Sequence, residues 1–351
     1  VRLAKSSNMD ELSDTNILKL INERNNKIDD KTIEHWLSEI VDKSPELKSS
    51  TTQQYVCKKV DASKLQEKKA PPSLSKHNKL SINDKLIWDQ AYIEEYYGLH
   101  TQSKTWEYIS EAEYKTLRPT IGNALPTYAI SIIKKDENGN PVRAKYRIVV
   151  LGNLDPHDWS KSECFAPVMS QMELNLMMSL ACQLKTEPKQ GDFIQAFCQS
   201  TLPAHEQYIC KPPLGCPVTP PNTYLRLIKT LYGLKRSPRH WYEKSKKVLA
   251  SIGLHPSPNA PCLYSGTIIP GSAPLYLGMY VDDFIYFSTD PEVEKKFEVA
   301  LNLLLNVEFT GPPQYFLGLK VKCKKEDDHL SIFLSQEAAA TKLVHRACLS
   351  D

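Results

Sequence analysis

The sequence lacks several patterns that would assign it to a protein class at once. Its nine cysteines include no C-x-x-C pair, and no two histidines stand at zinc-finger spacing. Cys210 and Cys216 are too loosely spaced to indicate a metal site. No apolar run approaches about 18 residues and no secretion signal is visible, which predicts a protein without a membrane span. An odd number of cysteines without such pairs indicates reduced thiols in an intracellular protein.

The chain also has little net charge. Its 44 Lys and Arg residues face 41 Asp and Glu residues, which leaves +3. A nucleic-acid partner would therefore need a local basic patch. The sequence has no internal repeat. Because it begins with Val1 and not Met, we expect a fragment, or a piece of a longer polyprotein.

Composition changes along the chain near residue 80. The 351 residues are enough for two units of roughly 150 residues each. Within 1–80, an amphipathic helix is predicted around Trp36, and a Ser- and Lys-rich stretch from Lys43 to Leu80 is typical of a linker. We therefore expect 1–80 to be a polar, partly disordered tail of an upstream polyprotein region, and order to begin near Ser81.

The first ordered elements are predicted from caps and turns. The stretch "NDKLIWDQAYIEEYYG" is typical of a helix that buries Leu86, Ile87, Ala91 and Tyr97 and stops at Gly98. "SEAE" at 110–113 matches a capping box. Two β-rich runs flank the dipeptide Asn-Gly at 138–139, which predicts a hairpin.

The second half alternates between helices and strand pairs. A capped helix at 170–184, with Ser170 and Glu173 as its box, is predicted to bury Leu176, Met177 and Leu180. Strands follow near 208–210 and 224–228. Next comes a helix capped by Ser237, whose buried stripe is predicted to contain Trp241, Ser245, Val248, Leu249 and Ile252. A hairpin near 275–288 and a helix from about 291 follow it. The chain then forms a second hairpin, of 315–321 with 330–335, and a terminal helix. This order predicts an α+β fold with an antiparallel sheet backed by helices.

Two adjacent carboxylates interrupt the apolar run "GMYVDDFIYF" at 278–287. Burying an unpaired carboxylate costs several kcal/mol, so Asp282 and Asp283 are expected at the turn of a hairpin. An ordinary Asp-containing turn explains the pair equally well. Asp192, in "KQGDFIQAF", adds a third carboxylate that could reach the same sheet edge. Three such groups would raise one another's pKa unless cations neutralised them, and a pair of Mg²⁺ ions suits phosphoryl transfer.

At this point the motifs resemble a known family. "YVDD" at 280–283 and "QGDFIQAF" resemble the aspartate motifs of reverse transcriptases. "LYGLKRSPRHWY" at 231–242, "YFLGLKV" at 315–321, "AKYRIVVLGN" and "LSQEA" resemble the copia/Ty1 (Pseudoviridae) branch of long-terminal-repeat retrotransposons. The resemblance covers roughly residues 84–349 in matching order. It implies an RNA-directed and DNA-directed DNA polymerase.

The resemblance implies a right-hand fold and a metal-dependent centre. Fingers would span about 81–190, the palm about 165–322, and the start of a thumb 323–351. Asp192, Asp282 and the backbone carbonyl of Phe193 would hold two Mg²⁺ ions, for which Mn²⁺ can substitute. Asp283 would be the third catalytic carboxylate, nearer the primer end.

Further residues would bind the nucleotide. Phe197 would block a 2′-hydroxyl and so select dNTPs, although plain core packing is the alternative. Lys145 and Arg147 would approach the triphosphate from one face of a strand, or simply face solvent on an edge strand.

The "GLKR" segment and the last hairpin supply the remaining implied contacts. Gly233, Lys235 and Arg239 would cover the nucleotide and template base; the alternative is a solvated helix face. Trp241 and Tyr242 are expected in the core. A primer grip is implied at Tyr315, Phe316, Leu317 and Gly318.

Implied partners are an RNA template, a DNA primer or RNA–DNA hybrid, and dNTPs, with an integrase module upstream, RNase H downstream and no membrane. Implied locations are cytoplasmic virus-like particles or the nucleus.

Many relatives carry a Lys before the grip that is a candidate general acid. This sequence has no Lys between Glu308 and Lys320, so the identity of the general acid stays open. Because the chain ends at Asp351, early in the thumb, a truncated or decayed element that binds nucleic acid without polymerising is the alternative. A phosphatase or nuclease would leave the ordered motifs unexplained.

Overall fold

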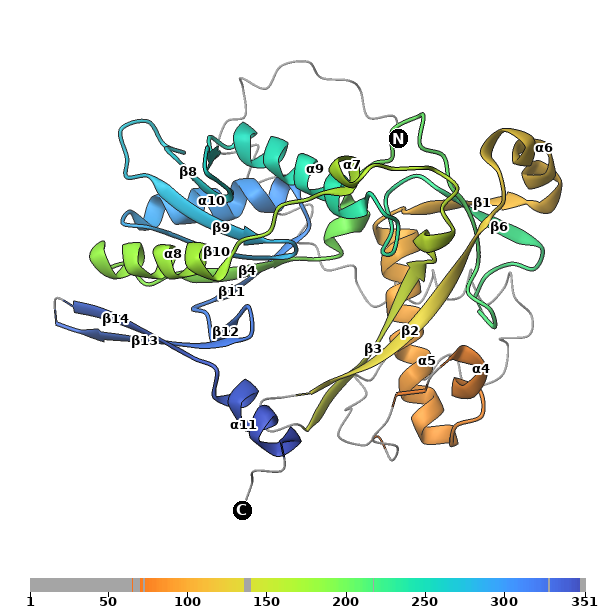
Figure 1. Ribbon diagram of the computed structural model, residues 1–351, viewed down its shortest axis with the longest axis horizontal. Coiled ribbons are helices and arrows are strands. Elements are labelled where there is room, and N and C mark those ends of the chain that lie inside the picture. Colours follow the sequence, from red (N-terminus) through yellow and green to blue (C-terminus); the bar gives the residue numbers. More distant parts are fainter. Residues whose placement is uncertain are drawn as a thin grey trace, which may run out of the picture. The chain divides into compact units, whose positions relative to one another are not determined.

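The computed structural model describes residues 65, 70, 71, 73–135, 140–216, 218–327 and 329–347. All of them belong to one compact unit, Lys59–Asp351. The helix predicted around Trp36 lies outside the described residues. Within them, strands form three sheets and several helices pack against these sheets (Figure 1). The predicted α+β arrangement is confirmed. No helix among these residues has both the length and the apolar composition that a bilayer crossing requires.

The first sheet has five strands in the order β1-β6-β5-β2-β3. Neighbouring strands are antiparallel except β2 and β5, which are parallel. The predicted hairpin is confirmed as β2 and β3, although its turn at 136–139 lies outside the described residues. The strands are β1 (Trp106–Ser110), β2 (Leu125–Lys135), β3 (Pro141–Val150), β5 (Ile209–Lys211) and β6 (Thr223–Leu227).

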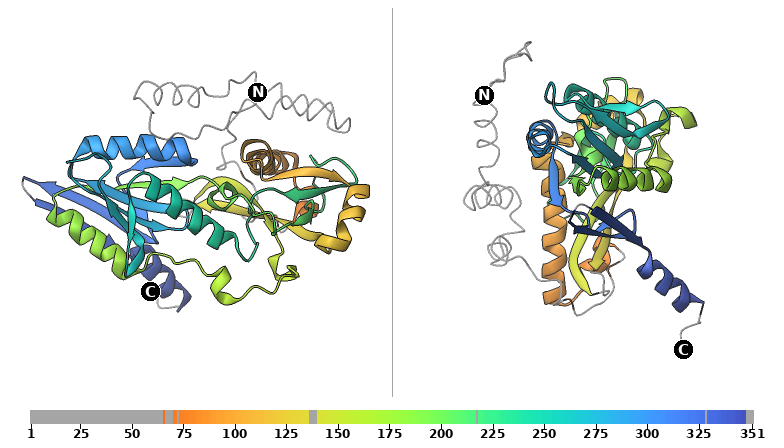
Figure 2. Two further views of the ribbon diagram at one scale, coloured as in Figure 1. Left: turned by 90° about the horizontal axis from the view of Figure 1, so that it is seen from above. Right: turned by 90° about the vertical axis from the view of Figure 1, so that its left-hand side faces the viewer.

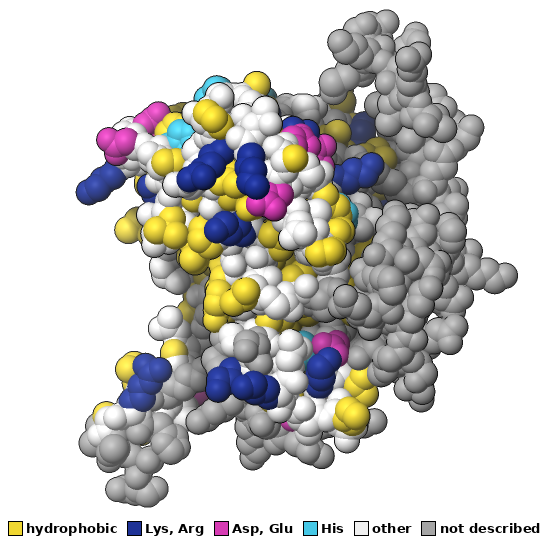
Figure 3. Space-filling model, turned by 90° about the vertical axis from the view of Figure 1, so that its right-hand side faces the viewer, with side chains coloured by type: hydrophobic (Ala, Val, Ile, Leu, Met, Phe, Trp, Pro, Cys, Tyr) yellow, Lys and Arg dark blue, Asp and Glu magenta, His cyan; other side chains and the backbone are white. Residues whose placement is uncertain are grey.

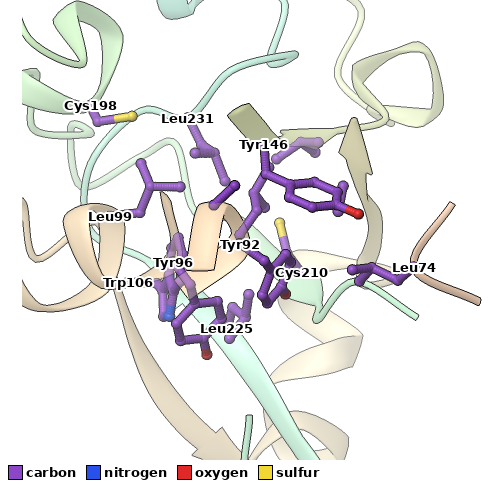
Figure 4. Packing of buried hydrophobic residues seen from close by; sticks show 14 of the residues in the cluster. Leu74, Tyr92, Tyr96, Leu99, Trp106, Tyr146, Cys198, Cys210, Leu225 and Leu231 are labelled. Atoms are coloured by element: carbon purple, nitrogen blue, oxygen red, sulfur yellow. The ribbon is translucent and has the colours of Figure 1, made fainter. Parts of the chain in front are cut away.

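Helix α5 (Ile82–Tyr97) lies along the β2–β3 hairpin and buries an aromatic face. Trp88 and Tyr92 each meet the ring of Tyr146 on β3 edge-on, at 5.5 and 5.4 Å between centroids. Figure 4 shows Tyr92 and Tyr96 in this core together with Cys210 and Leu225 from the neighbouring strands.

Three predictions about this helix and its neighbours need correction. The buried stripe includes Ile87 and Ala91 as predicted, but Leu86 and Tyr97 are only half-buried. α5 ends at Tyr97 and Gly98 follows it, as predicted, but not through a left-handed glycine cap. The φ of Gly98 is −57°, and the chain continues as a π-helix, η3 (Gly98–Gln102).

The predicted linker is wrong for its described end. Leu65, Pro71 and Leu74 are buried, and Leu74 is the first residue of a short helix, α4 (Leu74–His77). The His77 side chain is 2% exposed and its Nε2 lies 3.0 Å from Oδ1 of Asp89 on α5. These residues pack on the core because a few apolar side chains within the polar stretch find a surface to cover.

The second sheet has six antiparallel strands in the order β11-β4-β10-β9-β8-β7. Helices α9 (Ser237–Ser251) and α10 (Pro291–Leu304) cover one face, and α8 (Gln171–Gln183) covers the other (Figures 1 and 2). The strands are β4 (Lys189–Phe193), β7 (His255–Ser257), β8 (Ala260–Gly266), β9 (Leu275–Tyr280), β10 (Asp283–Ser288) and β11 (Val307–Gly311).

Strand β10 shows why the sheet is buried on both sides. Phe284 and Tyr286 join the core under α9 and α10, whereas Ile285 and Phe287 join the core against α8. Alternate residues of a strand face opposite sides of its sheet, so a continuous apolar run marks a sheet with two covered faces.

A third sheet is formed by β12 (Tyr315–Phe316), β13 (Leu319–Glu326) and β14 (His329–Ser335), and α11 (Glu337–Arg346) follows. The predicted strand 315–321 is broken, because Leu317 and Gly318 have positive φ values of 50° and 76° and form a turn. Short helices complete the described chain: α6 (Glu111–Ile121), η4 (Gly152–Leu154), α7 (Lys161–Cys164) and η5 (Ala196–Gln199).

The predicted helix caps fare unevenly. The capping box of Ser170 and Glu173 is confirmed, but Leu176 on that helix is 59% exposed, and the buried residues are Leu174, Met177, Met178 and Ala181. Ser110 accepts the predicted hydrogen bond from the Glu113 amide. Ser237 does not cap α9: Arg236 occupies the cap position, and the Ser237 hydroxyl donates to the Leu231 carbonyl. Of that helix's predicted stripe, Trp241, Ser245 and Leu249 are buried, whereas Val248 and Ile252 are half-buried.

Candidate active site

Three carboxylates from three strands form a row on one face of the six-stranded sheet. Asp192 on β4 is paired with Asp283 on β10 and with Glu308 on β11. Directly opposed residues of antiparallel strands point to the same face, with their Cβ atoms about 5 Å apart. The structure therefore brings Asp192 together with the aspartate turn, and it adds Glu308, which sequence reasoning missed.

Asp282 lies in the turn between β9 and β10, as predicted. Its carbonyl accepts a 2.7 Å hydrogen bond from the backbone amide of Phe193. The neighbouring Val281 has a φ of +55°, a strained value for a β-branched residue. Nε1 of Trp241 donates to the Val281 carbonyl at 2.6 Å. Strand β4 and helix α9 thus hold this strained turn in place from two sides.

Strand β4 is fitted closely to β10. A Cβ on Gly191 would stand 2.2 Å from Cζ of Phe284, so only glycine fits at this position. Phe193 is 1% exposed, and its ring lies 4.7 Å from that of Phe284 and 5.0 Å from that of Trp241. These contacts set the register that places Asp192 opposite Asp283.

The acidic row disfavours its own ionised state. Burial raises the pKa of Asp283 to about 6, and the charges of Asp282 and Asp192 add to this shift. Burial and the charge of Asp282 also raise the pKa of Asp192, and Glu308 contributes in the same direction. Lys134 and Lys145 act on the pKa of Asp192 in the opposite sense. Like charges this close favour protonation or the binding of a cation.

The acidic row offers oxygen donors of the kind that a divalent metal binds. Among the described residues, no three His, Cys, Asp or Glu side chains stand close enough as they lie to hold a metal ion. The donor chemistry does fit Mg²⁺, which prefers carboxylate and carbonyl oxygens. Burial, and after it the repulsion among the carboxylates, raises the pKa of Asp192 and Asp283, and a bound cation would offset both effects. The residues present therefore suit a hard cation, with the side chains drawn closer together.

Basic side chains of the five-stranded sheet act on this acidic row. Lys145 and Arg147 share one face of β3, as predicted, and the intervening Tyr146 is buried on the other. Burial lowers the pKa of Lys145, and the nearby Lys134 lowers it further. Both lysines affect the pKa of Asp192. Lys145 is thus half-buried and, like the exposed Lys134, close enough to affect the pKa of Asp192, although β3 is an edge strand.

Arg147 and Phe197 meet through a residue that sequence reasoning missed. The Arg147 guanidinium lies 5.4 Å from the ring centroid of Tyr232, and Phe197 lies 5.6 Å from the same ring. Burial raises the pKa of Tyr232, and the charge of Asp282 contributes to that shift. Phe197 itself is half-buried. Tyr232 therefore connects the cation, the aromatic residue and the aspartate turn.

A close backbone approach fixes Tyr232. Its carbonyl accepts from the Val150 amide at 2.7 Å. Gly233 has a φ of +92°, and a Cβ on it would stand 2.0 Å from the Val150 carbonyl oxygen. A Cβ on Gly152 would stand 2.0 Å from the Gly233 carbonyl oxygen. Both glycines are needed because the two loops lie backbone against backbone.

With this geometry established, residues 114–351 match the family described as "Reverse transcriptase (RNA-dependent DNA polymerase)". The chain belongs to this reverse transcriptase family. Its relatives are Pol polyproteins of copia/Ty1-type transposons. It is 30% identical over 215 residues to the retrovirus-related Pol polyprotein from transposon TNT 1-94 of Nicotiana tabacum. It is 27% identical over 259 residues to the transposon Ty1-LR2 Gag-Pol polyprotein of Saccharomyces cerevisiae.

These matches differ in how much of each chain they cover. They span 61% and 70% of this chain, but only 16% and 14% of the two polyproteins. Among solved structures, a foamy viral protease–reverse transcriptase in complex with double-stranded DNA covers 82% of this chain and 45% of its own, with 15% identity and a TM-score of 0.34.

The predicted cations of "GLKRSPR" contact other parts of this chain. Lys235 is exposed, and its Nζ lies 3.5 Å from the Asp155 carbonyl. Arg239 donates to the Phe165 carbonyl at 3.3 Å and pairs with Glu243 at 2.6 Å. Trp241 and Tyr242 are buried, as predicted.

Of the four predicted grip residues, Tyr315 and Phe316 form β12, and Leu317 and Gly318 form the tight turn between β12 and β13. Phe316 is 2% exposed and joins the core against α8, whereas Tyr315 and Leu317 are half-buried. On the face drawn in Figure 3, Lys and Arg side chains stand in several groups separated by apolar and uncharged surface.

Proposed function

We propose that this chain is the polymerase part of a copia/Ty1-type Pol polyprotein and extends a primer 3′-hydroxyl with dNTPs on an RNA or DNA template. The observation that carries the proposal is the register of β4 and β10, which opposes Asp192 and Asp283 beside the Asp282 turn. Membership of the reverse transcriptase family supports it.

Asp192, Asp282 and the Phe193 carbonyl would hold two Mg²⁺ ions, for which Mn²⁺ can substitute, and Asp283 would lie toward the primer end. Such ions stabilise the attacking and leaving oxygens in phosphoryl transfer. The chain's own contribution is to hold these oxygens on one rigid face. Trp241 keeps the turn in position through the Val281 carbonyl.

The cations of β3 would receive the triphosphate. Lys145 and Arg147 lie on one strand face, half-buried, where charge is screened less than at an exposed surface. Phe197, with Tyr232 behind it, would exclude a 2′-hydroxyl. Gly233, Lys235 and Arg239 would border the template base, and residues 315–318 would hold the primer end.

We propose three parts: fingers (about 81–190), a palm (about 165–322) and the start of a thumb (323–351). One boundary changes. Strands β5 and β6, within the palm range, hydrogen-bond into the β1–β3 sheet. The fingers would therefore use two chain segments.

Proposed partners are the RNA template, the RNA–DNA hybrid, and integrase and RNase H modules of the same polyprotein. The proposed location is cytoplasmic virus-like particles or the nucleus.

Primer extension tests the proposal. The chain is given poly(rA)·oligo(dT), dTTP and Mg²⁺ or Mn²⁺, beside Asp282→Asn and the control Asp290→Asn. Asp290 caps α10 through the Glu292 amide, and Asn caps equally well. We expect incorporation by the wild type and the control only. Equal incorporation by Asp282→Asn would overturn the proposal, and template binding without incorporation would identify a non-catalytic remnant.

A further inference from the structure

A buried carboxylate lies behind the proposed triphosphate cations and takes no part in the proposed chemistry. Glu95 on α5 is 8% exposed. We propose that Glu95 is a positioning residue that holds Lys145 and Arg147 in a fixed relation to the segment that follows Asp192. This inference rests on the proposed function, because it assigns those cations to the nucleotide.

The first contact of Glu95 is with strand β3. Its Oε1 accepts from the Ile148 backbone amide at 3.4 Å. Strand β3 is the edge of its sheet, so an outward amide has no strand partner. The Glu95 carboxylate binds this edge at the residue after Arg147. The charges of Lys145 and Arg147 both act to lower the pKa of Glu95. Helix α5 thereby fixes the part of β3 that carries the cations.

The second contact is with the segment that follows Asp192. The Gln195 side chain lies beside the Glu95 carboxylate and acts to lower its pKa. Oε1 of Gln195 accepts from the Ser103 hydroxyl at 2.7 Å, which directs the amide nitrogen toward Glu95. Gln195 has a φ of +51° and begins the turn that presents Phe197. One carboxylate thus joins the cation strand to the segment between Asp192 and Phe197.

The charge of Glu95 is costly where it lies. Burial raises its pKa to about 6, against the opposing effects of Lys145 and Arg147. The charge also raises the pKa of Cys198 and of Tyr232. A residue kept only for folding would be replaced by glutamine without loss, because an amide fits the same space without the desolvation cost.

Two mechanisms predict opposite effects of neutralising Glu95. If its charge merely weakened the cation site, Glu95→Gln would bind phosphate more tightly. If it positions the cations, the same variant would bind phosphate more weakly, because the segment of β3 that carries Lys145 and Arg147 loses the charged group that fixes it. Glu94→Gln is the matched control: Glu94 is the preceding residue, is exposed, and pairs with Arg143 on the same strand at 2.5 Å.

The experiment combines kinetics with a binding measurement that needs no turnover. For Glu95→Gln we expect the KM for dTTP to rise roughly five- to tenfold, with kcat and the Kd for poly(rA)·oligo(dT) within about twofold. Binding of inorganic tripolyphosphate, measured by calorimetry, should weaken by a similar factor. The thermal midpoint should stay equal or rise, and Glu94→Gln should match the wild type throughout.

Unchanged or tighter tripolyphosphate binding by Glu95→Gln overturns the inference, as does a fall in kcat with KM unchanged. The two proposals fail separately. A wild type that incorporates no dTTP contradicts the polymerase proposal, while weaker tripolyphosphate binding by the variant still supports the positioning role.

Discussion

Asp192 and Asp283 are directly opposed residues of neighbouring antiparallel strands, and the pKa of both is raised. Like charges in this arrangement oppose folding by roughly 0.2–1 kcal/mol per pair. The chain therefore carries a local instability at the centre of its proposed active site. That cost is expected where a sheet is arranged to receive a cation rather than to be stable alone.

Asp283→Asn should make the metal-free protein more stable. The folded pKa of about 6 lies above the ordinary value of 3.8, so the native state binds the proton more tightly than the unfolded state. The stabilisation from protonation is complete below about pH 4 and is lost as pH rises through about 6. In EDTA at pH 7.5 we expect the variant to gain about 1 kcal/mol, after allowance for partial exposure.

Urea unfolding at several pH values measures this gain, which should vanish by about pH 4. Adding Mg²⁺ should stabilise the wild type more than Asp283→Asn. The control, Glu111→Gln, changes an exposed carboxylate that pairs with Lys115 on the same helix. It should shift each curve by at most about 0.5 kcal/mol, whether or not Mg²⁺ is present. A variant less stable than the wild type in EDTA would contradict the proposed repulsion.

Gly233→Ala should destabilise the fold strongly. The substitution combines a positive φ with a Cβ placed 2.0 Å from the Val150 carbonyl oxygen, and backbone atoms cannot move aside cheaply. We expect a loss of about 3–4 kcal/mol in urea unfolding. Gly271→Ala separates the two causes: its φ is +80°, but nothing lies within 4 Å of the added Cβ. That control should lose only about 1 kcal/mol. Similar losses at both positions would show that close packing is not the cause.

Trp241→Phe should reduce turnover more than it reduces stability. The change removes the donor to the Val281 carbonyl and leaves a ring to pack on Phe193. We expect kcat in primer extension to fall roughly tenfold, because the turn that bears Asp282 loses a support worth about 1 kcal/mol. Trp88→Phe is the control, since Nε1 of Trp88 has no hydrogen-bond partner among the described residues. An equal fall in kcat for both variants would point to general loosening of the core.

Phe197→Val should relax the choice between dNTPs and NTPs. A half-buried ring at this position would exclude a 2′-hydroxyl by its bulk, and the discrimination lost should be roughly 10- to 100-fold. The ratio of kcat/KM for dTTP and UTP on poly(rA) measures it. Tyr232→Phe keeps the ring that supports Phe197 and should leave the ratio unchanged. An unchanged ratio in Phe197→Val would leave this residue as ordinary packing.

Local patterns predicted much of the second half of the chain. The apolar runs around Asp282 predicted two buried strands joined by a turn at the aspartates. Asp282 does lie in that turn, whereas Asp283 is already the first residue of β10. The register that joins Asp192 to Asp283 could not be derived, because it depends on the fit of Gly191 against Phe284. Glu308 was missed for the same reason, since its strand pairs with one distant in sequence.

The helix predictions failed where tertiary contacts outweigh pattern. On α5, the aromatic rings of Trp88 and Tyr92 are buried because Tyr146 of β3 faces them. Periodicity alone therefore gave the wrong phase for Leu86 and Tyr97. Glu95 was missed because a charged residue in a helix is normally on the exposed face.

The glycine at the end of α5 has a consequence for how this protein can vary. Its backbone is ordinary helix, and any residue could adopt it. A Cβ on Gly98 would, however, come within 2.8 Å of Nε2 of Gln195. Alanine there would turn a flexible amide away from Glu95 and leave the helix intact. Natural variation at Gly98 should therefore be tolerated only with a compensating change at position 195. A substitution of Gly98 alone should weaken substrate binding and leave the stability of the fold unchanged.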